Sequence, residues 1–258
     1  MGQLRIRAMA RSGAGQGKTH LAATFPRFYA IVTTPGEEDT WLVRPELKAN
    51  CVKMVYAAAS DQADTKRMFT ELDQQIGEAK QMARDGQVES LSLDNLTNLV
   101  ENRWLYINQY QATKTRDGQV DTRSMYGTLN RWCHEFVAMK LLTFPGNLIV
   151  TVHEQVEEDE AMEKLPDKTS PISPAILGGF RHRISTFFSL DLCLEKQRLG
   201  QDSYKYIART NKGNLRNAKS RYPLPEIIEN ISYNSIMAAI NKSMGVADKG
   251  LPTAGAAK

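Results

Sequence analysis

Short apolar runs alternate with longer segments of helical periodicity along most of the chain. The runs at 28–34 and 147–152 are rich in β-branched and aromatic residues, and each borders a Pro-Gly breaker, so both predict buried strands. Between them, a helix capped by Ser60 or Asp61 places apolar residues at helical spacing over 69–83, until Asp85-Gly86 ends it. This alternation predicts parallel βαβ units, and therefore an α/β fold.

Further elements fill in the same pattern. We expect a strand over 4–10 and a helix over 20–25, followed later by strands over 51–56 and 88–93 and helices over 96–110 and around 129–137. Arg5 and Arg7 alternate with Leu4 and Ile6, which suits a half-covered strand better than a fully buried parallel one.

The C-terminal third has a different character. Residues 155–180 contain an acidic cluster, three prolines and Gly178-Gly179, and such a long irregular connection is usually functional or mobile. Alternating apolar positions over 188–194 and 204–208, with a turn near Gly200, predict an antiparallel hairpin added to the sheet. We expect one main domain over 1–232, then a C-terminal helix and flexible tail over 233–258.

Composition narrows the class of protein. The 258 residues are 41% hydrophobic and 24% charged, which is ordinary for a globular domain. No apolar stretch approaches a membrane span and no apolar signal segment begins the chain, so we expect a cytoplasmic protein without a membrane partner. The three cysteines are far apart and form no C-x-x-C pair, which argues against a disulfide framework or zinc site. The net charge of +4 permits contact with nucleic acid.

The most informative motif is the stretch from Ser12 to Thr19, SGAGQGKT, which resembles the phosphate-binding P-loop G-x-x-x-x-G-K-[ST] with Ser12 in place of the first glycine. It lies between a predicted strand and a predicted helix, the context that this chemistry needs, because backbone N–H groups and a helix N-terminus both favour an anion. Lys18 is expected to reach the β- and γ-phosphates of ATP or GTP, and the Thr19 hydroxyl to ligate Mg²⁺. The residues expected to contact the nucleotide are Gly13, Ala14, Gly15, Gln16, Gly17, Lys18, Thr19 and His20.

Three acidic residues are candidates for the rest of the site. Asp94 ends the predicted 88–93 strand and is expected to support Mg²⁺, directly or through water, although an ordinary strand-ending Asp-Asn turn has the same sequence. Glu37 and Glu38 follow the 28–34 strand, and either is a candidate for the base that acts on the attacking water. A solvated acidic turn is an equal alternative for this pair.

Other polar residues follow the remaining strands. His153 emerges after the 147–152 strand at the same edge as Asp94, where an imidazole can sense a γ-phosphate or simply cap the strand. Lys212, Arg216, Lys219 and Arg221 follow the hairpin. They are candidates for contact with nucleic acid, for a cationic finger reaching a neighbouring subunit, or for a solvated basic face.

These elements in this order, with the Gly-Lys-Thr loop, Asp94, His153, the long loop and the hairpin followed by Lys219-Ser-Arg221, resemble the RecA-like phage ATPases, including phage nucleotide-binding proteins associated with single-strand annealing. The resemblance covers roughly residues 3–230 and implies a RecA-like P-loop core that binds ATP with Mg²⁺, assembles on single-stranded DNA and promotes phage homologous recombination or annealing. It also implies a homo-oligomer, as a filament or ring, and a single-strand DNA-binding protein as a partner.

By position, the resemblance implies a role for each candidate residue. Lys18 and Thr19 would hold phosphate and metal, Asp94 would support the metal, and Glu37 or Glu38 would act on water. His153 would be the sensor, and Lys219 with Arg221 would act in trans on a neighbouring subunit.

Two other functions remain open from the sequence. The chain can be a nucleotide-binding interaction module of a phage replication or assembly complex that hydrolyses little ATP. It can also be a ring helicase or packaging motor, which shares the core. The absence of an accessory nuclease or primase-like domain in the 258 residues argues against this function, although a partner chain could supply one. ATP turnover with and without single-stranded DNA distinguishes the recombinase from the interaction module.

Overall fold

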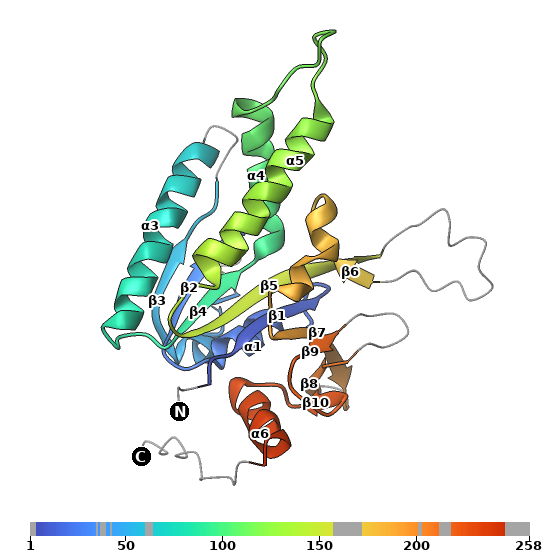
Figure 1. The fold of residues 1–258 in the computed structure, drawn as a ribbon. Coiled ribbons are helices and arrows are strands. Elements are labelled where there is room, and N and C mark those ends of the chain that lie inside the picture. The colour runs from blue at the N-terminus through green and yellow to red at the C-terminus, as the bar shows by residue number, and fades with distance from the viewer. Residues whose placement is uncertain are drawn as a thin grey trace, which may run out of the picture.

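A β-sheet with helices on both faces forms the centre of the molecule (Figure 1). The computed structural model describes residues 4–34, 36, 40–41, 43–59, 64–156, 172–200, 203–211 and 218–245. In this part of the chain the sheet has ten strands, with β6 beside β5, β9 beside β7, and the rest in the order β10-β8-β7-β1-β5-β4-β2-β3. The strands are β1 (Arg7–Ser12), β2 (Phe28–Val32), β3 (Cys51–Tyr56), β4 (Ser90–Asp94), β5 (Asn147–Val156), β6 (Ile172–Pro174), β7 (Leu190–Arg198), β8 (Tyr204–Arg209), β9 (Lys219–Ser220) and β10 (Ile227–Glu229).

The sheet is mostly parallel. All neighbours from β3 to β7 along this order pair in parallel, whereas β6, β8, β9 and β10 pair antiparallel with their neighbours. This arrangement confirms the predicted α/β fold with a C-terminal antiparallel hairpin, made by β7 and β8. The short strands β6, β9 and β10 have too few residues to show an alternating pattern, and the sequence did not predict them.

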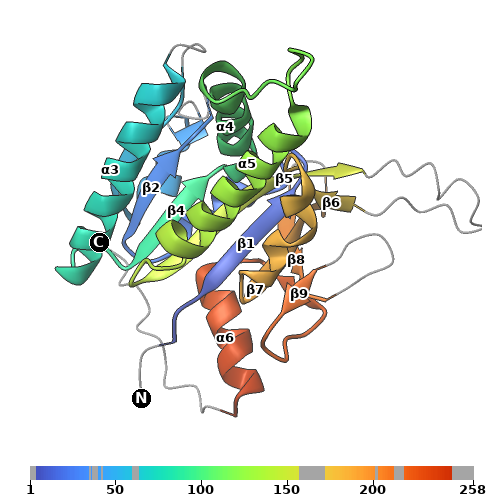
Figure 2. The same ribbon diagram turned by 45° about the horizontal axis from the view of Figure 1, so that its top comes forward.

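Helices cover the two faces of the sheet unequally (Figures 1 and 2). The main helices are α1 (Lys18–Ala23), α3 (Thr65–Arg84), α4 (Leu96–Tyr110), α5 (Thr122–Glu135) and α6 (Tyr233–Ser243). Apolar residues of α3, α4 and α5 share one buried core with Met9, while those of α1 and α6 share the other with Ala8 and Ala10. Adjacent residues of β1 thus enter opposite cores, as alternating strand side chains must.

The strand that precedes the P-loop lies in the middle of the sheet, and here our expectation of a half-covered strand was wrong. Strand β1 begins at Arg7 and is paired on both sides, by β5 and β7. Arg5 precedes the strand, and the Arg7 guanidinium donates to the carbonyl oxygens of Phe144 (2.6 Å) and Gly146. The two arginines therefore lie at the start of a buried strand: Arg5 is exposed, and Arg7 finds its partners at the edge of the sheet.

Segments of the long C-terminal connection fold against this sheet. Of the predicted 155–180 loop, β6 pairs with the end of β5 and a 3₁₀ turn follows at Gly179–His182, whereas residues 157–171 lie outside the described residues. Ile236 and Ile240 of α6 are buried in the same core as α1, and Ser232 caps that helix with a capping box. Within the described residues, no helix combines the length and apolarity that crossing a membrane requires.

A buried ion pair joins the central strands just below the P-loop. The Arg11 Nε atom lies 2.8 Å from Asp191 Oδ1, and the two side chains are 1% and 0% exposed. Ser185 donates to the other carboxylate oxygen at 2.6 Å, and Arg11 also contacts Glu154 at 3.6 Å and the Ile172 carbonyl at 3.2 Å. Burial is the largest single effect and lowers the pKa of Arg11, but Asp191, Cys193 and Glu154 together outweigh it and leave that pKa raised, so Arg11 stays charged.

Removing one member of this pair should destabilise the fold strongly. Arg11→Met leaves the Asp191 carboxylate buried without its counter-ion, and we expect the free energy of unfolding in urea to fall by about 3–5 kcal/mol. The control is Lys140→Met, which breaks the exposed pair with Asp73 and should cost less than about 1 kcal/mol. Equal losses in the two variants would contradict a structural role for the buried pair.

Candidate nucleotide-binding site

The candidate site forms where parallel strands end side by side. Ser12, the last residue of β1, pairs with His153 on β5, and Val32 of β2 pairs with Asp94, the last residue of β4. Strand β5 lies between β1 and β4. Because the carboxyl ends of parallel strands meet at one edge, residues from 12, 94 and 153 come together there.

The loop from Gly13 to Gly17 connects β1 to α1 and has the backbone that its glycines allow. Gly15 and Gly17 have φ values of 71° and 99°, the left-handed region in which a side chain is strained. Ser12 replaces the first glycine of the motif, but it belongs to β1 and is not among the described residues with positive φ. The substitution is therefore compatible with the loop, because no left-handed backbone is required at that position.

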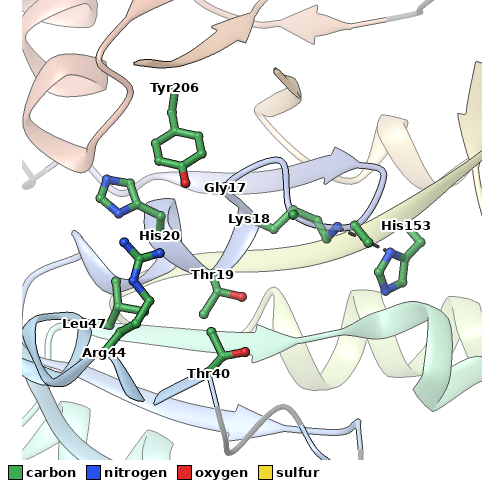
Figure 3. Close-up of a pocket in the computed structure, with 11 residues that line it drawn as sticks. Gly17, Lys18, Thr19, His20, Thr40, Arg44, Leu47, His153 and Tyr206 are labelled. Atoms are coloured by element: carbon green, nitrogen blue, oxygen red, sulfur yellow. Dashed lines mark hydrogen bonds between the residues drawn. The ribbon is translucent and has the colours of Figure 1, made fainter. Parts of the chain in front are cut away.

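Lys18, the first residue of α1, folds back over the loop. Its Nζ donates to the carbonyl oxygens of Ser12 (3.1 Å) and Gly13 (2.8 Å) and lies 3.3 Å from Nδ1 of His153 (Figure 3). The side chain is 7% exposed. A flexible ammonium held by carbonyl oxygens beside a glycine loop can exchange those partners for phosphate oxygens.

Thr19 and Asp94 meet directly beside the loop. The Thr19 hydroxyl donates to Asp94 Oδ2 at 2.9 Å, and Thr151 of β5 donates to the other carboxylate oxygen. Asp94 is 2% exposed. The sequence did not single out Thr151, because a threonine within an apolar strand carries no signal of its pairing partner.

His153 lies between Lys18 and Asn95. Its Nε2 atom is 3.1 Å from the Asn95 side-chain nitrogen, and its backbone N–H donates to Thr97 at 3.0 Å. Burial, and then the nearby Lys18 charge, lower the pKa of His153 further than Asp94 raises it. The imidazole is therefore neutral near pH 7, with one donor and one acceptor nitrogen.

The pocket beside these residues has a second end of different chemistry (Figure 3). The whole pocket encloses about 190 Å³. Away from Lys18 and His153 it is lined by Thr40, Arg44, Leu47 and a ring pair, in which Tyr206 of β8 stacks on His20 with centroids 4.9 Å apart. Tyr206 was missed as a site residue, since the alternation of Tyr204, Lys205 and Tyr206 equally suits hairpin packing.

The β7–β8 hairpin also contacts the loop itself. The Gln16 side-chain oxygen accepts a hydrogen bond of 2.8 Å from the Lys196 backbone N–H, and the Tyr206 ring packs directly on Gly17. The hairpin therefore fixes the tip of the loop. Sequence distance hid this contact, because 180 residues separate Gln16 from Lys196.

The remaining predicted residues have different outcomes. Glu37 and Glu38 lie outside the described residues, as do Lys212 and Arg216. Lys219 pairs in β9 with Asp191, which is opposite Met9, three residues before Ser12 on β1. Arg221 follows and donates to the Thr186 carbonyl at 3.0 Å. Lys219 is thus roughly 10 Å down the sheet from the loop of its own chain.

Comparison with known proteins identifies the class. The family model described as an AAA domain (AAA_24) matches residues 5–222, so the chain belongs to this AAA-domain family of P-loop ATPase-like proteins. No curated protein sequence matches the chain.

Similar solved structures were found as well. One is described as a prototypical ATPase from the type III secretion system of pathogenic bacteria, with 16% identity, a TM-score of 0.44, and coverage of 73% of this chain and 51% of that chain. Another is the assembled ATPase EscN from the enteropathogenic E. coli type III secretion system, with 13% identity, a TM-score of 0.43, and coverage of 74% and 43%. This chain therefore spans about half the length of these proteins or less.

An AAA domain implies binding of a nucleoside triphosphate with Mg²⁺, and the residues present fit both groups. The loop backbone and Lys18 are suited to phosphate oxygens. The Thr19 hydroxyl and the Asp94 carboxylate, 2.9 Å apart, are the hard oxygen ligands that Mg²⁺ prefers.

Because Gly17 has a positive φ and Gly13 does not, alanine at these two positions should affect the stability of the protein unequally. In Gly17→Ala the new Cβ would lie 2.5 Å from the Tyr206 ring at φ 99°. The backbone cost alone is about 1–2 kcal/mol, so the nucleotide-free protein should unfold at lower urea concentration.

The matched control is Gly13→Ala. A Cβ at this position meets nothing within 4 Å and Gly13 has no positive φ, so the stability of this variant in urea should be close to that of wild type. Adding Tyr206→Ala to Gly17→Ala should restore only the part of the loss that comes from the clash. Equal stability of the two single alanine variants would disprove the geometry.

Proposed function

We propose that this protein is a Mg²⁺-dependent ATPase. The observation that supports it best is the convergence of Lys18, Thr19, Asp94 and His153 at one edge of the sheet, within hydrogen-bonding distance of one another in pairs. A cationic phosphate ligand and a pair of oxygen ligands for the metal are groups that phosphoryl transfer uses around a triphosphate, and the neutral imidazole adds a donor beside them.

Each residue has a defined task in this proposal. Backbone amides from Gly13 to Gly17 hold the phosphates, and Lys18 leaves the carbonyl oxygens of Ser12 and Gly13 for the β- and γ-phosphates. Thr19 and Asp94 would hold Mg²⁺, and the bound metal would supply positive charge to neutralise the charge on the phosphates. Positioning and electrostatic stabilisation of this kind supply most of the rate in phosphoryl transfer.

The base and the trans-acting cations complete the proposal. Glu37 or Glu38 orients the attacking water. Lys219 and Arg221 act on the nucleotide of a neighbouring subunit, which is consistent with their distance along the sheet from the loop of their own chain. This assignment requires a homo-oligomer, as a filament or ring.

We propose further that the ATPase acts on single-stranded DNA in phage recombination or annealing. We place this activity in the host cytoplasm, with a single-strand DNA-binding protein as a partner. The support is the resemblance of the motif order to RecA-like phage ATPases and the net charge of +4. We keep the boundaries expected from the sequence, with one P-loop domain over 1–232 and a C-terminal segment over 233–258, whose helix α6 packs on the core of the domain.

Lys18→Ala should remove most of the affinity for ATP. Loss of a charge-assisted hydrogen bond costs about 1.5–3 kcal/mol, so the dissociation constant should rise about 10- to 100-fold in titration calorimetry. Lys53→Ala is the control, because this lysine is exposed on β3 and pairs with Glu78. Unchanged affinity in Lys18→Ala would end the proposal.

Single-stranded DNA should raise the rate of ATP turnover in wild-type protein, whereas double-stranded DNA of the same length should raise it less. Steady-state phosphate release at low salt measures both, since phosphate contacts weaken as salt rises. Flat, negligible turnover with intact ATP binding would favour the alternative of a nucleotide-binding interaction module.

A further inference from the structure

The Asn95 side chain has only one orientation that satisfies its hydrogen bonds. Its Oδ1 accepts from the Asn98 backbone N–H at 2.9 Å, the N-cap contact of α4, and its Nδ2 donates to Thr34 Oγ1 at 3.0 Å. Turning the amide over would place a donor against the Asn98 N–H. The nitrogen of Asn95 is therefore the atom that faces Nε2 of His153, 3.1 Å away.

A neutral imidazole cannot accept from both of its neighbours. Asn95 Nδ2 faces one ring nitrogen and the Lys18 ammonium faces the other at 3.3 Å, and both are donors. Only one nitrogen of the ring carries a lone pair for acceptance. The positions of these two donors therefore determine which nitrogen keeps the proton.

The imidazole lone pair accepts from Asn95 rather than from Lys18. It is fully buried and fixed by Asn98 and Thr34, and no rotation removes its N–H from the ring. Lys18 is flexible and already has acceptors in the Ser12 and Gly13 carbonyls, at 3.1 and 2.8 Å. An unmatched donor is costly when buried, so the proton belongs on the nitrogen that faces the flexible partner.

We propose that Asn95 is a positioning residue that holds the proton of neutral His153 on Nδ1, so that the ring presents an N–H toward the terminal phosphate. The Nδ1–H group and the Lys18 ammonium are then two donors that converge on one place, and an anion between them satisfies both. This inference rests on the proposed function for the identity of the anion, but the location of the proton does not depend on it.

The tautomer is measurable in the nucleotide-free protein. Long-range ¹H–¹⁵N spectra of histidine-labelled protein distinguish a protonated from an unprotonated ring nitrogen, and His153→Gln identifies the signals of His153 among the four histidines. We expect protonated Nδ1 and unprotonated Nε2 in wild type. Protonation at Nε2 in the wild-type protein would overturn the proposal, and His153→Gln serves only to assign the signals.

Asn95→Asp tests the cause. Aspartate keeps the N-cap acceptor but replaces the donor that faces Nε2 with an oxygen, so the proton should move to Nε2 or the ring should gain a second proton. The control Asn98→Ala removes the hydrogen bond from Asn98 to Thr34, leaves its backbone N–H, and should keep the wild-type tautomer. A wild-type spectrum in Asn95→Asp would overturn the proposal.

Binding gives a second readout. If Nδ1–H contacts the terminal phosphate, Asn95→Asp should reduce the preference for ATP over ADP about tenfold, which corresponds to roughly 1.4 kcal/mol, while ADP affinity changes little. An unchanged ratio would overturn the phosphate contact. If wild type binds neither nucleotide, the proposed function fails while the tautomer result stands by itself.

Discussion

The hydrogen-bonded pairing of β1 with β5 positions the whole site. This pairing sets Ser12 beside His153, and the next pairing, of β5 with β4, brings Asp94 to the same edge. A shift of one residue would turn His153 to the opposite face of the sheet. The register is determined by burial, because Ala8 and Ala10 must enter one core while Met9 enters the other.

The ends of the strands alone do not hold the loop from Gly13 to Gly17 in place, and the β7–β8 hairpin supplies further contacts to it. Glycines between 13 and 17 cost conformational entropy to order. The Gln16 contact to Lys196 and the Tyr206 ring on Gly17 constrain that loop from outside the sheet. The same ring stacks on His20 at the far end of the pocket. The antiparallel addition to the parallel sheet therefore belongs to the architecture of the site.

Local signals in the sequence predicted the end of this pocket that is formed by Lys18, Thr19 and His153, and long-range contacts supplied what the sequence missed. The P-loop motif fixes Lys18 and Thr19, and strand-end positions brought Asp94 and His153 to the predicted edge. Tyr206 joins through a hairpin register that no local pattern encodes. The sequence did not single out Asn95, because both its cap contact with Asn98 and its contact with His153 depend on the folded structure.

Two adjacent residues near the end of β5 connect the site to the buried ion pair of Arg11 and Asp191. His153 faces Lys18, while the next residue, Glu154, contacts Arg11. Successive strand residues point to opposite faces, so this segment of backbone is held from both sides. Arg11 in turn precedes Ser12, whose carbonyl oxygen holds Lys18. The buried pair thus fixes the backbone on both sides of the contact between Lys18 and His153, and the sensor role that we propose for His153 requires such a rigid support.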